Sequence, residues 1–525
     1  MSLGRYRLTH ILRRGWGILH RIRRNPGLLS FRTAGRFIGR SVRHSPLSLF
    51  RLQIGACTEE HVGELNRQAE TADADWLLLV PENARDDRSL TTAFAETVRT
   101  RPDADVIYAD EVYASPGQGG KGVSLKPEFN PELLLSYNYI GYPALIRRRC
   151  FCALGGLMPA FGAAADHDLW LRAWVAGLHF IRIPQVLIHA PGISKRATQG
   201  ETTRVVEAFC QQNRPDLVAL PGRVAGTVQV KGRFDEFPAV TLVVPTCQSR
   251  VGDGGLPAED PSLPHVLYML DSLSKSSWPM DKLTVLVGDD KEDGSVYLNR
   301  DWDFELQRLY TPRSAGEPFH YARKMNNMWK KVATEAIVLI NDDVRVSSPG
   351  WLEALLTFSL DPDVGGVGAR LVFPDGRLQH AGIVGGPFGT AVHAWFGDPA
   401  DKPTYQDWGL VHRDWSMVTG AVFATRRSVL EQVAGFDEAF ALEFNDLDLC
   451  LRLGLLGYRI VYTPHAELIH FEKASRGPAD TPAHELARFR RRWGGLIADD
   501  PAYHPGLSRD SYHIAVSPQR VSRRV

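Results

Sequence analysis

Three polar residues follow a short apolar segment in the second half of the chain. Asn341, Asp342 and Asp343 come directly after AIVLI at 336–340. If that segment is a buried strand, Asn341 and Asp343 point the same way, because residues two apart on an extended chain share a face. Oxygen ligands of this kind suit Mg²⁺ or Mn²⁺, above all when substrate phosphates complete the coordination shell. The alternative is a polar turn, which commonly follows a strand.

A second group of candidates lies about a hundred residues further on. Asp446 opens a predicted helix, where a carboxylate could take a proton from an attacking hydroxyl. The alternative is a plain helix start, with Asn445 as the cap and Asp446 and Asp448 favourable in the first turn. His470 follows the strand-like segment AELI and could be a ligand or simply a hydrogen-bonding residue.

Basic and acidic residues that could bind a nucleotide flank these candidates. Lys473 and Arg476 follow His470 and could face phosphate, although a solvated loop is the more ordinary interpretation. Asp289 ends the apolar segment TVLVG, where an acidic side chain can hydrogen-bond a base or ribose or can simply form a turn. A further predicted helix, PFHYARKMNNM, contains three polar residues that would otherwise lie on its surface: Arg323, Lys324 and Asn326.

The elements that must position these residues form one α/β unit. TLVVP at 241–245, TVLVG at 284–288 and AIVLI at 336–340 are continuous apolar runs separated by helix-length segments. Such runs are typical of a parallel sheet covered by helices. Open sheets of this kind bind ligands at the carboxyl ends of their strands, which is where most of the candidates fall.

An internal repeat relates the two halves of the chain. Gly155 precedes Asp168 by 13 residues, and Gly435 precedes Asp448 by the same interval, with a Phe in each interval and with Leu and Arg at matching positions after each Asp. The first copy has little room for the early strands. It has PEN at 81–83 where the second copy has its acidic residues, so we expect a truncated domain without a nucleotide site.

Composition excludes several classes of protein. Of 525 residues, 44% are hydrophobic and 23% charged, as in soluble globular proteins. No apolar run is long enough to span a membrane, and no secretory signal is visible. The six cysteines show no CxxC pair and no zinc spacing, which favours a reducing compartment.

The basic residues are unevenly distributed. Residues 1–58 contain twelve Arg, no Lys and no acidic residue, which leaves 49 basic against 60 acidic residues in the remainder. Arg mixed with apolar side chains suits amphipathic helices on an anionic membrane surface. The alternatives are a solvated arm or a segment that packs on the acidic body. Nucleic acid is not expected, because the body is acidic and carries no binding motif.

The order of these signals resembles the family-2 glycosyltransferases with the GT-A fold, in particular the bacterial branch that builds O-antigen and rhamnose-containing polysaccharides. The resemblance covers residues 240–480 and is carried by LINDDVRVSSPGWLEALL, FPDGRLQHAGIV and the long block from VTGAVFATRR to FEKASRG. It implies an α/β, GT-A (Rossmann-like) mixed sheet flanked by helices, preceded by a truncated GT-A-like domain. The implied organisation is an Arg-rich amphipathic tail (1–58), a degenerate domain (59–195), a linker (196–238), a catalytic domain (239–500) and a loosely ordered C-terminal tail (501–525).

The resemblance also implies roles for individual residues. Asp446 matches the general base, while Asp343 and His470 match the residues that hold Mg²⁺ or Mn²⁺. Gln379–Gly382 matches a recurrent segment of unknown chemical role. The positions expected to bind the sugar nucleotide are Thr246, Asp289, Arg323, Lys324, Asn326, Asp342, Lys473 and Arg476.

The implied reaction is inverting transfer of a sugar from a nucleoside diphosphate to a hydroxyl of a cell-surface polysaccharide or lipid-linked glycan. A cytoplasmic protein, peripheral on the inner face of the membrane, would suit that acceptor. One alternative is a sugar-1-phosphate nucleotidyltransferase, although the segment after TLVVP lacks a basic Gly-rich loop. Another is a non-catalytic scaffold that binds glycan or an assembly partner.

Overall fold

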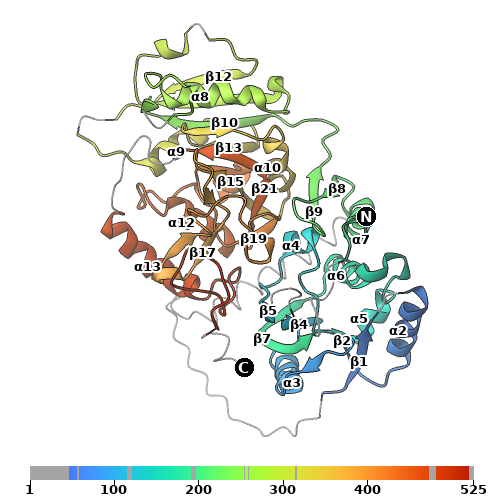
Figure 1. Cartoon of the computed structure of the whole chain (residues 1–525). Coiled ribbons are helices and arrows are strands. Elements are labelled where there is room, and N and C mark those ends of the chain that lie inside the picture. The colour runs from blue at the N-terminus through green and yellow to red at the C-terminus, as the bar shows by residue number, and fades with distance from the viewer. Residues whose placement is uncertain are drawn as a thin grey trace.

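The computed structural model describes residues 47–518 except 56–57, 115–120, 191–196, 253–254, 258, 299, 314–315 and 472–480. Two α/β units lie side by side, joined by a helix and a β-hairpin (Figure 1). None of the helices in the described ranges is long and apolar enough to cross a membrane. The predicted Arg-rich tail falls almost entirely outside the described residues.

The first unit is built on a mixed sheet in the order β1-β2-β6-β4-β7-β3, with β5 paired to β4. Its strands are β1 (Leu49–Ile54), β2 (Trp76–Pro81), β3 (Arg85–Asp86), β4 (Val106–Ala114), β5 (Lys121–Ser124), β6 (Ala144–Arg147) and β7 (Phe180–Ala190). Its helices are α2 (Glu59–Thr71), α3 (Leu90–Thr100), α4 (Pro131–Ser136), α5 (Arg148–Ala153) and α6 (Ala165–Val175).

Strand β1 corrects the predicted boundary of the N-terminal tail. Leu49–Ile54 pair in parallel with β2, and Leu52 and Ile54 are buried in the core. The alternation of Leu52, Gln53 and Ile54 is an ordinary half-buried strand pattern, which the surrounding arginines obscured. The tail therefore ends before residue 49 rather than at residue 58.

The predicted linker contains regular structure. Helix α7 (Gln199–Asn213) begins with a capping box, in which Thr198 and Glu201 exchange side-chain and backbone hydrogen bonds. The hairpin of β8 (Leu217–Pro221) and β9 (Val228–Gly232) follows and leads directly into the second unit.

The second unit contains a ten-stranded mixed sheet whose main path is β12-β11-β10-β13-β20-β15-β21-β14. Its strands are β10 (Val240–Thr246), β11 (Leu283–Asp289), β12 (Glu305–Tyr310), β13 (Ala336–Ile340), β14 (Val344–Val346), β15 (Val364–Val372), β16 (Leu378–His380), β19 (Arg413–Trp415), β20 (Val422–Arg426) and β21 (Arg459–His470). A separate ribbon pairs β17 (Ile383–Gly385) with β18 (Ala391–His393). The helices are α8 (His265–Ser272), α9 (Tyr321–Trp329), α10 (Trp351–Ser359), α11 (Arg427–Gln432), α12 (Asn445–Leu455) and α13 (Ala483–Ala498).

The predicted parallel strands are present in this sheet. β10 pairs in parallel with both β11 and β13, and every residue of β10 and β13 is buried. Burial on both faces explains why these strands are continuously apolar rather than alternating. The mixed α/β fold expected from the sequence is confirmed.

The two sheets share an order of pairing. The path β1-β2-β6-β4-β7-β3 corresponds strand for strand to β10-β13-β20-β15-β21-β14, with the same parallel and antiparallel senses. In the described residues of the first unit, no strands correspond to β11 and β12. One strand that the sequence analysis considered missing, β1, occupies the place of β10.

Polar contacts hold the units together. Asn130 donates from Nδ2 to the Asp414 carbonyl at 3.0 Å and accepts from the Asp414 N–H at 3.0 Å. His504 Nε2 lies 2.8 Å from Asp110 Oδ2, with both side chains buried. His504 belongs to the segment that was predicted to be loosely ordered. Up to residue 518 this segment instead packs on both units, burying Tyr503, Leu507 and Ile514.

Candidate active site

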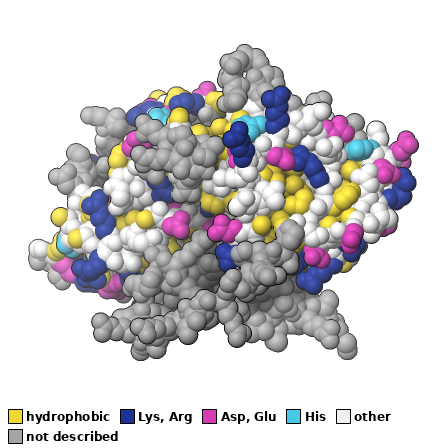
Figure 2. All heavy atoms as spheres, turned by 90° about the horizontal axis from the view of Figure 1, so that it is seen from below, with side chains coloured by type: hydrophobic (Ala, Val, Ile, Leu, Met, Phe, Trp, Pro, Cys, Tyr) yellow, Lys and Arg dark blue, Asp and Glu magenta, His cyan; other side chains and the backbone are white. Residues whose placement is uncertain are grey.

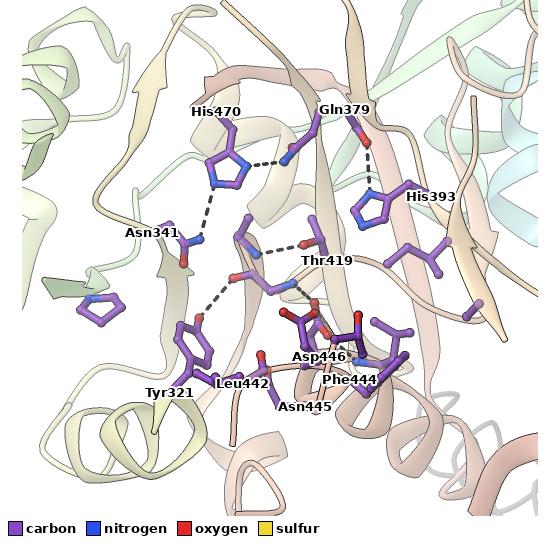
Figure 3. A pocket seen from close by; sticks show the side chains of 18 of the residues that line it. Tyr321, Asn341, Gln379, His393, Thr419, Leu442, Phe444, Asn445, Asp446 and His470 are labelled. Atoms are coloured by element: carbon purple, nitrogen blue, oxygen red, sulfur yellow. Dashed lines mark hydrogen bonds between the residues drawn. The ribbon is translucent and has the colours of Figure 1, made fainter. Parts of the chain in front are cut away.

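A pocket of about 740 Å³ opens at the carboxyl ends of β10 and β13. Helices α9 and α12, the β17–β18 ribbon and the end of β21 complete its walls (Figure 3). Of the predicted site residues, those that line this pocket are Thr246, Lys324, Asp342, Asp343, Asp446 and His470. Segments more than two hundred residues apart in the chain therefore meet at one cavity.

The predicted metal-binding residues lie in contact. His470 Nε2 is 3.1 Å from Asp343 Oδ1, and both side chains are buried. Gln379 Nε2 donates to His470 Nδ1 at 2.7 Å, while the amide of Asn341 lies 3.5 Å from His470 Nε2. Gln379 thus fixes the plane of the imidazole from the side away from Asp343.

This pair would fit a divalent ion if the Gln379 amide is turned over, so that its Oε1, which has no hydrogen-bond partner among the described residues, accepts from Nδ1–H and leaves the Nε2 lone pair of His470 for the metal. Two ligands at about 2.1 Å from an octahedral ion stand about 3.0 Å apart when they are neighbours in its shell. The separation between Asp343 and His470 matches that value. The described residues contain no cluster of three or more His, Cys, Asp or Glu that could hold a metal. Diphosphate and water oxygens would therefore have to supply most of the remaining coordination.

The two adjacent acids are held in different electrostatic environments. Burial would raise the pKa of Asp343, but the facing His470 outweighs it and the pKa is lowered. Burial, and next the charge of Asp343, raises the pKa of Asp342. Asp343 is therefore the acid that the fold keeps ionised beside His470.

A second cluster occupies the strand end of β10. Thr246 donates from Oγ1 to Asp342 Oδ2 at 2.6 Å, and Lys324 donates from Nζ to the Thr246 carbonyl at 2.8 Å. Lys324 also pairs with Asp290, and both side chains are almost fully buried. Asp290 lines the pocket but was not predicted, because it follows the more obvious Asp289 at the end of β11.

Three predicted nucleotide-binding residues, Asp289, Arg323 and Asn326, do not line the pocket. Asp289 is fully buried behind it and accepts hydrogen bonds from Gln248, Tyr297 and Arg308. Arg323 points to Glu317 and Glu438 on the surface. The spacing of these residues on the chain did not reveal which face of the strand or helix they occupy.

Asn326 has a structural role of its own. Its amide donates to the Phe436 carbonyl at 2.9 Å and accepts from the Phe436 N–H at 2.9 Å. It therefore anchors the loop before α12 to helix α9. Lys473 and Arg476, the remaining predicted phosphate-binding residues, lie outside the described residues.

Asp446 sits at the start of α12, on the pocket wall. Its carboxylate accepts from the Gly420 N–H at 2.7 Å and from the Leu447 N–H at 2.8 Å. Burial raises its pKa, and these two N–H groups oppose the shift only in part. A carboxylate with a raised pKa accepts a proton more readily than an ordinary Asp.

The polar residues next to Asp446 on the helix, Asn445 and Asp448, have other hydrogen-bond partners. Asn445 is the first residue of the helix rather than its cap, and its amide donates to the Leu442 carbonyl at 2.8 Å. Asp448 is fully buried and pairs with Arg452, whose guanidinium donates to the carbonyls of Val433 and Gly435. Of the two acids of the DLDL segment, Asp446 alone lines the pocket.

The first unit repeats the Asp448 arrangement. Asp168 accepts from Arg172 Nε at 2.9 Å, and Arg172 donates to the carbonyls of Leu154 and Gly156. Asp166, which corresponds to Asp446, accepts from the His167 N–H and from Asn138 Nδ2. The repeated sequence pattern thus contains a shared structural ion pair.

Two further pocket residues come from the QHAG segment and the ribbon that follows it. The Gln379 carbonyl accepts from His393 Nδ1 at 3.0 Å, so one residue contacts both His470 and His393. Figure 3 shows His393 on the same side of the pocket as Asp446, with Asn341 on the opposite side. The sequence signal for Gln379 was the recurrent segment itself, whereas nothing in the sequence pointed to His393.

Comparison with known families identifies the second unit. Residues 238–495 match the model of the family described as "Glycosyltransferase like family 2". The chain therefore contains a member of glycosyltransferase family 2, and the predicted family is confirmed for this unit.

Curated relatives extend beyond this unit. The protein y4gI of Sinorhizobium fredii is 29% identical over 88% of this chain and 51% of its own length. The O-antigen biosynthesis protein RfbC of Myxococcus xanthus is 30% identical over 78% of this chain and 32% of its own. The N-acetylglucosaminyl-diphospho-decaprenol L-rhamnosyltransferase of Mycobacterium tuberculosis is 30% identical over 31% of this chain and 55% of its own. The chain thus spans about half or less of the length of these relatives, and the first two alignments include much of the first unit.

Similar solved structures include a mannosyltransferase of Pyrobaculum calidifontis in complex with GDP-Man and Mn²⁺. It is 17% identical, with a TM-score of 0.32, over 50% of this chain and 74% of that one. GalNAc-T7 with UDP, GalNAc and Mn²⁺ is 10% identical, with a TM-score of 0.36, over 49% of this chain and 48% of that one. With TM-scores this low, neither the ligands nor the mechanisms of these two proteins can be assigned to this chain. The description of the fold depends instead on the sheet order and the family match.

Proposed function

We propose that the second unit transfers a sugar from a nucleoside diphosphate to a hydroxyl of a glycan, with inversion at the anomeric carbon. The observation that carries this proposal is one pocket lined by a proton-accepting carboxylate, Asp446, and by a metal-compatible pair, Asp343 and His470. A single displacement needs both functions within reach of one sugar, one for the nucleophile and one for the leaving group.

In this mechanism the attacking hydroxyl oxygen forms a bond to the anomeric carbon while the bond from that carbon to the diphosphate oxygen breaks. Asp446 takes the hydroxyl proton, and its two backbone donors hold the carboxylate in place. Asp343 and His470 would hold Mg²⁺ or Mn²⁺, which offsets the charge developing on the leaving diphosphate. The Thr246, Lys324 and Asp342 cluster would hold the nucleotide portion.

The acceptor is proposed to be a cell-surface polysaccharide or a lipid-linked glycan. The names of the relatives support this choice, since they include O-antigen biosynthesis and rhamnosyl transfer to a diphospho-decaprenol. A rhamnosyl donor is the first candidate for the same reason. Contact with the membrane through residues 1–58 stays a prediction, because that segment lies almost entirely outside the described residues.

The first unit is proposed to be a degenerate, non-catalytic copy. It shares the strand order of the second unit and the buried Asp–Arg pair, but PEN at 81–83 replaces the acidic segment. The contacts of α4 with the second unit suggest that it supports the active unit mechanically.

The test is product analysis with the full chain. The purified protein is incubated with dTDP-rhamnose, UDP-glucose and GDP-mannose, with Mg²⁺, Mn²⁺ or EDTA. Metal-dependent release of a nucleoside diphosphate from one donor supports the proposal. Release of pyrophosphate from a sugar 1-phosphate and a nucleoside triphosphate would instead favour nucleotidyl transfer. Absence of metal-dependent donor turnover and donor binding across the panel would favour a scaffold.

A further inference from the structure

Three exposed aromatic side chains gather at the pocket. Phe388, Phe396 and Tyr512 all line it, with exposed fractions of 49%, 37% and 46%. They are three of the seven large hydrophobic residues that are exposed in the described part of the chain. Aromatic surface clustered in this way commonly marks a binding site, whereas isolated exposed residues need no explanation. We call this group the aromatic rim.

The rim is held in place by backbone contacts between distant segments. The Phe388 N–H donates to the Arg509 carbonyl at 3.0 Å, and the Trp395 N–H donates to the Tyr512 carbonyl at 2.8 Å. The ring centroids of Phe388 and Tyr512 are 5.4 Å apart, and those of Phe396 and Tyr512 are 6.0 Å apart. The C-terminal segment therefore fixes the backbone at Phe388 and at Trp395, the residue before Phe396.

Two residues in or next to the aromatic rim have a left-handed backbone conformation. Phe388 has a φ of 53° and Trp395 a φ of 56°. Bulky residues rarely adopt left-handed conformations, and the strain is retained where the surroundings enforce it. Phe388 and Phe396, the residue after Trp395, both line the pocket.

The rim and the proposed base line the same pocket. The ring centroid of His393 is 6.0 Å from that of Phe396, and Figure 3 shows His393 on the side of the pocket where Asp446 lies. The hydroxyl of Thr390 is buried in the same wall and has no hydrogen-bond partner among the described residues. A buried hydroxyl without a partner is costly, and a polar group of a ligand would satisfy it.

We propose that the aromatic rim is the acceptor subsite, where a pyranose ring of the acceptor stacks and presents one hydroxyl to Asp446. One face of a sugar ring carries C–H groups that suit the electron-rich face of an aromatic ring, while its edge carries hydroxyls for groups such as Thr390. A lipid chain would gain from the aromatic rings but not from the Thr390 hydroxyl. This inference rests on the proposed function and names the acceptor side of that site.

The test measures sugar contact without any donor. Saturation-transfer difference NMR is recorded on the full chain with methyl glycosides of L-rhamnose, D-glucose, D-galactose and N-acetyl-D-glucosamine. We expect saturation of the ring protons of at least one glycoside. Tyr512→Ala and Phe396→Ala should weaken that binding about 10-fold. Tyr512→Phe should retain it.

The matched control is Tyr310→Ala. Tyr310 is 45% exposed on the edge strand β12 and does not line the pocket. This variant should bind the glycoside as the unchanged protein does. Circular dichroism and thermal unfolding of every variant exclude loss of fold as the cause of weaker binding.

Other outcomes overturn the subsite. Equal saturation in the unchanged protein and in Tyr512→Ala would do so, as would no saturation with any glycoside. Loss of binding to phosphatidylglycerol vesicles in Tyr512→Ala, with glycoside contact unchanged, would assign the rim to a lipid surface. Donor turnover is measured separately, so a failed subsite with metal-dependent nucleoside diphosphate release leaves the proposed function standing.

Discussion

At the scale of single residues, Asp446 is the group on which the proposed chemistry depends. Asp446→Asn keeps the shape of the side chain and one of the two oxygens that accept from backbone N–H groups, but it removes the proton acceptor. We expect sugar transfer to fall by at least ~100-fold. Binding of the nucleoside diphosphate, measured by calorimetry, should stay within about twofold. Near-normal transfer by this variant would show that another group is the base.

The raised pKa of Asp446 predicts a pH dependence. The base must be ionised, so transfer is supported above its pKa and lost as the pH falls through it. Because burial raises that pKa above the usual 3.8, activity should decline at a higher pH than an ordinary Asp would allow. A pH profile of kcat checks this, with Asp446→Glu as a second base of different reach. A flat profile down to pH 4 would contradict the assignment.

Asp343 should govern metal dependence. Asp343→Asn removes a charged ligand beside His470, so binding of dTDP or UDP should lose at least ~10-fold of its Mn²⁺ enhancement. Titration calorimetry with and without Mn²⁺ measures this. Arg323→Ala is the matched control, because that side chain lies on the surface and pairs with Glu317. An undiminished Mn²⁺ effect in Asp343→Asn would remove the proposed metal site.

At the scale of elements, helix α12 carries two acids with different roles: Asp446 is the proposed base, and Asp448 has a structural role. Asp448 accepts hydrogen bonds from Arg452 and from Trp493 Nε1, fully buried. Asp448→Asn removes the buried charge that pairs with the Arg452 guanidinium, which should lower the free energy of unfolding by about 3 kcal/mol. Asp446→Asn removes a disfavoured buried charge but loses the acceptor of one backbone N–H, so it should cost clearly less, about 1 kcal/mol. Urea unfolding of the two variants compares them directly, and equal loss in both would refute the distinction.

The elements also show where sequence reasoning succeeded. The apolar runs at 241–245, 284–288 and 336–340 predicted buried strands, because only strands of a covered parallel sheet are apolar on both faces. The same reasoning placed Asp343 and Asp446 correctly at element ends. It could not decide between Asp289 and Asp290, because the end of β11 turns one acid inward and the next one toward the cavity.

The rest of the pocket was beyond local patterns. His393 and Tyr512 reach it through pairings between β17 and β18 and between the C-terminal segment and the loop at 395, and these are long-range contacts. A segment rich in Pro, Ser and Arg looks disordered when its partners cannot be seen. β1 was overlooked for a similar reason, since its neighbours in the chain are arginines while its neighbours in space are apolar.

At the scale of the whole molecule, the two units should unfold together. The reciprocal hydrogen bonds of Asn130 with Asp414 and the buried pair of His504 and Asp110 lie between them. Separating the units would leave these groups without partners, so we expect a single calorimetric transition for the full chain. Asn130→Ala should lower its midpoint by about 1 °C for each kcal/mol lost, because the entropy of unfolding grows with the length of the chain that unfolds together. Gln68→Ala, in α2 of the first unit, should not.

Two resolved transitions in the unchanged protein would contradict this coupling. In Figure 2, acidic, basic and apolar side chains are interspersed over the described part of the face seen from below. A single transition would support the proposal that the first unit is a fixed support of the second unit rather than an independent module.

The path of the C-terminal segment has a practical consequence for anyone expressing this protein. A truncation at residue 500, where the family match has already ended, would preserve every strand of the second sheet. It would also discard the histidine that meets Asp110 and the tyrosine that completes the rim. Such a shortened enzyme could still hydrolyse its donor while failing to glycosylate anything, and a screen based on nucleotide release alone would report it as fully competent.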